Sequence, residues 1–217
     1  ADTAAVGGTF TSFGQGTGNL NIGGRLYVGG FNNFTPGTGT FNVNTSGALS
    51  IAGGFAIGSD GSPGTVNIDS GNITTGGSNY IGNYEGIGGG VGTLRMSAGT
   101  FTNNGPRTII GLGDSTGSFQ MSGGLYNNTA LGSDNFFAIG VNNLANLTTP
   151  TLTLTGGTIN AARTFSVGGV EPFGGNPDPI FVGSGRGALV IDGPTAQLNT
   201  FGEFWVGQGG GSDGDFA

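Results

Sequence analysis

The chain has 217 residues, of which 51 are glycine, 35% are hydrophobic and only 8% are charged. Twelve acidic residues against five arginines give a net charge of −7, and the sequence contains no lysine, histidine or cysteine. This composition excludes disulfides and thiolate metal sites, and it argues against nucleic acid as a partner, because phosphate binding needs clustered cations. No apolar run approaches the ~20 residues of a membrane-spanning helix, so we expect no membrane span.

A short motif recurs along the chain, in which a small residue or turn precedes an apolar–x–apolar triplet. In chain order, the copies are GNLNI (18–22), GTFNV (39–43), GTVNI (64–68), GTLRM (92–96), GSFQM (117–121), PTLTL (150–154) and GALVI (187–191). Each unit closes on an apolar residue followed by glycine, at Gly29, Gly58, Gly82, Gly111, Gly140, Gly168 and Gly207. A middle segment of the form S/T/D/A-G-x-apolar, such as SGNI (70–73), lies between them. Seven units fit, and most of the variation in length falls in the loops.

The triplets alternate apolar and polar residues, which is typical of a strand with one buried face. We therefore predict a stacked core made by the apolar positions: Phe41, Val43, Val66, Ile68, Leu94, Met96, Phe119, Met121, Leu152 and Leu154, with Leu20, Ile22, Leu189 and Ile191 in the outermost units. The residues between them should face outward: Asn21, Asn42, Asn67, Arg95, Gln120, Thr153 and Val190.

A unit with three short strands cannot bury its apolar face alone, but it can do so against the next unit. The sequence therefore predicts an all-β fold, a single parallel, right-handed β-solenoid domain over residues 1–217. We expect about seven coils of roughly 25–30 residues, each with three short strands and glycine-rich corners. A propeller would need longer blades, a sandwich would not repeat its sequence, and collagen would need glycine at every third position.

The motif GTLRMSAGTFTNN and its copies resemble the β-strand repeats of bacterial surface proteins, in particular autotransporter-passenger-like repeats and those of secreted PEP-CTERM-type proteins. The similarity covers residues ~16–207. It implies a β-solenoid and an exported protein, with a location outside the cell or on its surface after removal of a signal peptide. It implies little about activity, because such repeats occur in adhesins, enzyme-bearing passengers and surface layers.

Acidic residues follow several of the closing glycines at similar distances, namely Asp60, Glu85, Asp114 and Glu171. In stacked coils they would form an acidic edge, which could bind Ca²⁺, supply a catalytic pair, or simply reflect the preference of Asp for turns. We favour the turn interpretation, and so expect no enzyme activity, no catalytic residues and no cofactor, with Ca²⁺ as the alternative.

Three aromatic residues, Tyr27, Tyr80 and Trp205, take the outward position of the closing strands. They could stack on the sugars of surface glycans, pack against a neighbouring subunit, or be scattered surface aromatics.

The two ends of the chain read as incomplete coils. VGGTFTSFG (6–14) matches the middle and closing parts of a unit, GDFA (214–217) matches the start of one, and neither end carries a recognisable cap. We therefore predict that copies stack head to tail through Phe10, Phe13, Asp215 and Phe216, the two partial coils making roughly one whole coil. The function expected is a non-enzymatic structural subunit of an extracellular filament or surface layer. The alternative is a segment of a longer surface adhesin or of a glycan-binding or glycan-active passenger.

Overall fold

The computed structural model describes residues 4–6, 8–13, 17–30, 37–84, 89–132, 135–143, 148–169, 185–207 and 213–216, and the backbone alone in the strands at the two ends (4–13 and 213–216). Throughout this described part the regular structure is β-strand, and no helix is long and apolar enough to cross a membrane. The strands form three parallel sheets of eight, eight and seven strands, which we name A, B and C. The predicted all-β parallel solenoid is therefore confirmed.

The strands visit the three sheets in the repeating order A, B, C. Sheet A contains β1 (Ala4–Val6), β4 (Leu26–Val28), β7 (Phe55–Ile57), β10 (Asn79–Ile81), β13 (Arg107–Leu112), β16 (Phe136–Val141), β19 (Thr164–Val167) and β22 (Phe204–Val206). Sheet B contains β2 (Gly8–Phe13), β5 (Gly39–Val43), β8 (Pro63–Ile68), β11 (Val91–Met96), β14 (Thr116–Met121), β17 (Thr151–Leu154), β20 (Arg186–Ile191) and β23 (Asp213–Phe216). Sheet C contains β3 (Leu20–Ile22), β6 (Ala48–Ile51), β9 (Asn72–Thr75), β12 (Thr100–Asn103), β15 (Leu125–Asn128), β18 (Gly157–Ala161) and β21 (Ala196–Thr200).

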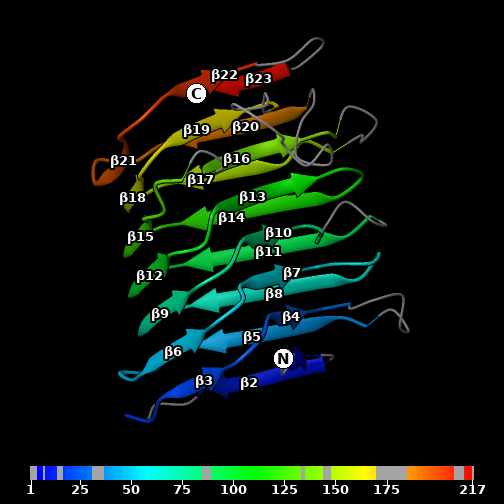
Figure 1. Ribbon diagram of the computed structural model, residues 1–217, viewed down its shortest axis with the longest axis vertical. Helices are drawn as coiled ribbons and strands as arrows, with labels where there is room; N and C mark the ends of the chain where they lie inside the picture. Colours follow the sequence, from blue (N-terminus) through cyan, green and yellow to red (C-terminus); the bar gives the residue numbers. More distant parts are fainter. Residues whose placement is uncertain are drawn as a thin grey trace.

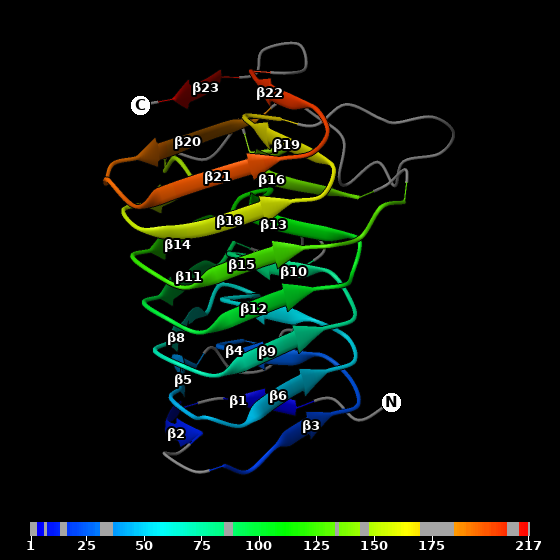
Figure 2. The ribbon, with the colours of Figure 1, turned by 90° about the vertical axis from the view of Figure 1, so that its left-hand side faces the viewer.

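The coils stack along one axis, with the N-terminal strands at one end and the C-terminal strands at the other (Figure 1). The strands of sheet A run in the opposite direction to those of sheet B, and sheet C joins the two sheets at one side (Figure 1). Figure 2 looks onto sheet C, whose strands run from left to right while the chain rises from the N-terminus to the C-terminus. The coil is therefore right-handed, as parallel crossovers generally are.

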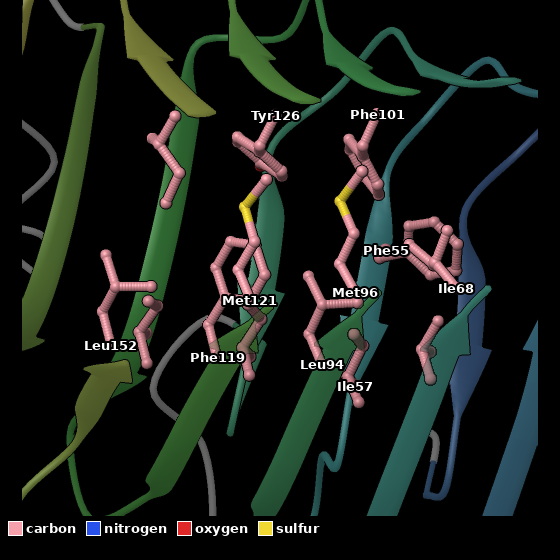
Figure 3. Close-up of a cluster of buried hydrophobic side chains, with 14 of the residues drawn as sticks. Phe55, Ile57, Ile68, Leu94, Met96, Phe101, Phe119, Met121, Tyr126 and Leu152 are labelled. Carbon is pink, nitrogen blue, oxygen red and sulfur yellow. The ribbon is translucent and has the colours of Figure 1, made fainter. Parts of the chain in front are cut away.

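The core is a set of apolar columns in which each residue lies against its counterpart in the next coil. All ten side chains of the predicted stack are buried, with exposed fractions of 3% or less. In the central coils the sulfur-bearing side chains of Met96 and Met121 extend toward Phe101 and Tyr126 of sheet C (Figure 3). The rings of Phe101 and Tyr126 stack with their centroids 4.8 Å apart. Leu20 and Ile22, nearer the N-terminal end, are only partly buried.

The first unit of the solenoid differs from the sequence prediction. GNLNI, which we expected to open that unit, is strand β3 of sheet C, where Leu20 pairs with Leu49 of β6. The opening strand is β2, which pairs with β5 of sheet B. The cause of the error is that the two strand types share a glycine–x–apolar start. Residues 17–20 (TGNL) fit the middle motif as well as SGNI does.

The three corners of the coil differ in the lengths of the connections between the strands. Apart from the single residue between β1 and β2, connections from sheet A to sheet B range from 3 residues (113–115) to 18 residues (168–185), whereas most of the other connections have two to four. The insertions therefore gather at one corner. There the chain turns sharply at glycines such as Gly58, whose φ is +71° and whose added Cβ would lie 2.1 Å from the carbonyl oxygen of Val91.

A buried polar network crosses the corner between sheets C and A. The Asn103 Nδ2 donates to the Thr108 hydroxyl (3.0 Å), and that hydroxyl is 2.7 Å from the hydroxyl of Tyr126. The Thr75 hydroxyl donates to Asn103 Oδ1 (3.1 Å) and accepts from the Asn79 Nδ2 (3.0 Å). Burial raises the pKa of the Tyr126 phenol well above its usual range, although its interactions with Thr108 and Asn79 act in the opposite direction. The network thus holds an uncharged phenol inside the core.

Candidate functional site

The predicted assembly residues lie in the strands at the two ends of the solenoid. Phe10 and Phe13 belong to β2, with Phe10 opposite Phe41, and Asp215 and Phe216 belong to β23, with Phe216 opposite Leu189. The side chains of these four residues lie outside the described part of the structure. The register nevertheless places both segments in sheet B, on the first and the last strand of that sheet.

The two ends do not make the complementary halves that the sequence suggested. The N-terminal segment supplies a closing strand, β1 in sheet A, and an opening strand, β2 in sheet B, rather than the middle and closing strands that we expected. The C-terminal segment likewise ends with a closing strand, β22, and an opening strand, β23. Placed directly end to end, two copies would continue sheets A and B but leave sheet C one strand short at the junction.

The last described coil exposes apolar side chains that are buried in the coil before it. Phe165 and Val167 of β19 are both 0% exposed, whereas Phe204 and Val206, which pair with them in β22, are 39% and 45% exposed. The rings of Phe165 and Phe204 are nearly parallel, at 7°, with centroids 5.6 Å apart. Phe204 therefore continues the aromatic stacking of the preceding coil, but with a far larger exposed fraction than Phe165. Phe204 was not predicted as part of an interface, although phenylalanine recurs at the same register position in β7, β16 and β19.

The aromatic residues on the outer face of sheet A are not available to a ligand in the way that the sequence suggested. Tyr27 and Tyr80 are only 6% and 4% exposed, and the ring of Tyr84 meets both of them edge to face, at 5.8 Å and 5.1 Å. The guanidinium of Arg25 lies over Tyr84, 4.3 Å from its ring centroid. Trp205 is half-buried in the last coil. The prediction that Tyr27 and Tyr80 are surface aromatics is therefore wrong, because Tyr84 packs against both rings and Arg25 lies over Tyr80.

The predicted acidic edge falls at the corner between sheets A and B. Asp60 is half-buried in a left-handed turn (φ +54°), and Asp114 is exposed two coils away. Glu85 and Glu171 lie outside the described residues, and the described part contains no group of three or more acidic side chains that could hold a metal ion. The expectation that these acidic residues serve turns, with Ca²⁺ binding as the alternative, stays a prediction.

A groove of about 670 Å³ runs along the outer face of sheet B and the corner where its strands turn toward sheet C. Five side chains in direct register form its floor, one from each of the strands β5, β8, β11, β14 and β17: Asn42, Asn67, Arg95, Gln120 and Thr153. A second row at the corner includes Asp69 and Ser97, and the hydroxyl of Ser97 donates to Asp69 Oδ1 (2.8 Å).

The floor of the groove consists of the outward positions predicted from the triplets, for which we expected only a polar surface. The second row was not predicted. A signal for that row exists, because a polar residue directly follows six of the seven triplets: Asn44, Asp69, Ser97, Ser122, Thr155 and Asp192.

Comparison with family profiles, curated proteins and solved structures gives no match for the chain. The β-solenoid implied by the resemblance to bacterial surface repeats is present in the structure. Membership of the autotransporter or PEP-CTERM type stays a prediction.

Proposed function

We propose that the chain is a non-enzymatic structural subunit of an extracellular filament or surface layer, in which copies stack end to end and continue sheets A and B. The observation that carries this proposal is the exposed apolar surface of Phe204 and Val206 on β22, in the last described coil. There Phe204 is 39% exposed, whereas Phe165, one coil earlier, is fully buried. A further coil placed on β22 would remove this apolar surface from water, which is favourable by roughly 25 cal/mol per Å².

The edges of the sheets support the same proposal. Among the described strands, β1 and β2 at one end and β22 and β23 at the other each have a single hydrogen-bonded neighbour within their sheets. Such edges are templates for strand addition. Contact between them would be heterologous, with one surface meeting a different one, so the operation repeats without closing and generates a fibre. A net charge of −7 would disfavour lateral clumping of the fibres.

The alternative is a segment of a longer surface adhesin or of a glycan-binding or glycan-active passenger. Among the described strands, seven belong to sheet C and eight to each of sheets A and B. A chain that continued beyond β23 would next supply a strand of sheet C, which is the strand that a direct junction between two copies lacks. The length of the gene product distinguishes the two proposals, because further coils after GDFA would place this strand in the same chain.

Electron microscopy of the purified protein tests the assembly proposal. Filaments should show an axial repeat of roughly 35–40 Å, since each copy contributes about eight strands spaced ~4.8 Å apart. Phe204→Asp should abolish them, because it places a carboxylate in the contact. Leu131→Asp is the matched control, since Leu131 is 74% exposed at a lateral corner, away from the stacking ends.

Circular dichroism should establish that both variants remain folded before assembly is scored. Folded wild-type protein that stays monomeric over a wide concentration range would refute the assembly proposal. Equal loss of filaments in Phe204→Asp and Leu131→Asp would also refute it, because the contact would then not lie at the end of the coil.

A further inference from the structure

The groove on sheet B is long and straight because the coils repeat in register. Each residue of its floor pairs directly with the next, from Asn42 on β5 through to Thr153 on β17 (strands located in Figure 1). Four strand spacings of ~4.8 Å make this row about 19 Å long. A surface of this shape suits a linear ligand lying parallel to the solenoid axis better than it suits a compact small molecule.

Four of the five floor side chains bond in two pairs along the row and keep further bonding capacity. The Asn67 Nδ2 donates to Asn42 Oδ1 (2.7 Å), and the Arg95 Nε donates to Gln120 Oε1 (3.3 Å). These bonds use one of the two amide N–H donors of Asn67 and one of the five guanidinium donors of Arg95. Arg95 and Gln120 are exposed, and Asn42 and Asn67 are half-buried. The row therefore presents donors and acceptors together, held in place by their mutual contacts.

The chemistry of the groove excludes most classes of linear ligand. A peptide strand has no backbone edge to pair with, because each of the strands β5, β8, β11, β14 and β17 already has a hydrogen-bonded neighbour on both sides. Nucleic acid would meet a single arginine in the groove of a protein whose net charge is −7. An extended apolar chain would leave the amides and hydroxyls of the floor without partners.

We propose that this groove binds a linear polysaccharide, whose successive hydroxyl groups both donate and accept hydrogen bonds. Asn67, Arg95 and Gln120 would contact consecutive sugar units along the solenoid axis. No aromatic side chain lines the groove, so each unit adds little affinity and binding depends on the length of the ligand. The inference does not rest on filament assembly, since a single copy carries the whole groove.

Isothermal titration calorimetry with defined oligosaccharides tests this proposal. Cellohexaose probes recognition of neutral hydroxyls, and hexagalacturonate probes recognition of carboxylates by Arg95. At least one of them should bind saturably, and more tightly than the corresponding disaccharide by about tenfold or more, a difference of ~1.4 kcal/mol. Binding of the neutral oligomer would assign the contact to hydroxyls, and binding of the uronate alone would assign it to Arg95 and an acidic polysaccharide.

The variant Asn67→Ala/Arg95→Ala/Gln120→Ala should weaken binding by about tenfold or more, because each truncation removes hydrogen bonds to the ligand. Asn160→Ala is the matched control. It removes a similar ladder on the outer face of sheet C, where Asn160 bonds to Asn127 and Asn199 at 2.8 Å, away from the groove. The control should bind as the wild type does. The proposal is overturned if neither hexamer binds, if hexamer and disaccharide bind equally, or if the triple variant and the control lose affinity to the same extent.

Discussion

The side chain of Phe119 provides the sharpest test of the stacked core. It is fully buried, and its ring meets that of Tyr126 edge to face with centroids 5.3 Å apart. Truncating a buried phenylalanine to alanine costs about 3–5 kcal/mol. Phe119→Asp adds the cost of an unpaired buried carboxylate, which is several kcal/mol more. Because domains are stable by about 5–15 kcal/mol in total, we expect Phe119→Asp to prevent folding.

Two further variants at this strand separate burial from simple sensitivity to mutation. Phe119→Leu keeps most of the apolar volume and should cost about 1–2 kcal/mol. Gln120→Asp introduces the same charge at the next residue, whose side chain is exposed on the outer face, and should change the stability by less than about 0.5 kcal/mol. Urea unfolding followed by circular dichroism measures all three variants. A folded Phe119→Asp protein, or an unfolded Gln120→Asp protein, would reverse the assignment of the two faces of this strand.

Three other features of the solenoid lead to measurable outcomes. Gly58→Ala should destabilise the fold by at least about 2 kcal/mol, since its Cβ would lie 2.1 Å from a backbone oxygen of the next coil. Gly61→Ala, with a similar φ of +74° but no atom nearer than 3.5 Å, should cost only about 1 kcal/mol; equal losses in thermal melts would contradict the role of close stacking. Burial raises the pKa of Tyr126 in the folded state. The contribution of Tyr126 to the free energy of unfolding is therefore complete below the unfolded pKa of about 10, and it declines as the pH rises further, by up to ~1.4 kcal/mol per pH unit. Unfolding measurements above about pH 10 should show a smaller decline of the free energy of unfolding with pH in Tyr126→Phe than in the wild type. An equal decline in both proteins would refute the assignment of this pH dependence to Tyr126. For Asp60 and Asp114 we expect chelators and added calcium to leave the melting temperature unchanged, and a large calcium-dependent rise would establish a cation site instead.

The repeating part of the fold could be predicted because its signal is physical and local. Val66 and Ile68 alternate with polar residues, and this alternation recurs with the glycine-rich corners, so strand direction, register and buried face follow from the pattern alone. The first unit was harder, since the opening and middle strands share a glycine–x–apolar start. Nothing within residues 17–22 distinguishes the two, and only pairing with the next coil places Leu20 in sheet C.

The functional surfaces could be predicted only in part, because they depend on neighbours that the repeat does not specify. The outward direction of Tyr80 follows from the alternation, but its burial depends on Tyr84, which lies in a connection rather than in a strand. The groove has the same origin. The alternation indicates that Arg95 and Gln120 face outward, whereas the hollow depends on the angle at which the chain turns from sheet B to sheet C.

The parallel stacking of the coils has a mechanical consequence. The hydrogen bonds that join one coil to the next point along the solenoid axis, so a tensile load applied along this axis is transmitted through every interface in series. The interface that yields first then sets the strength of the whole assembly. Adding coils makes such a solenoid longer but not stronger, whereas replacing the weakest interface would raise its breaking force.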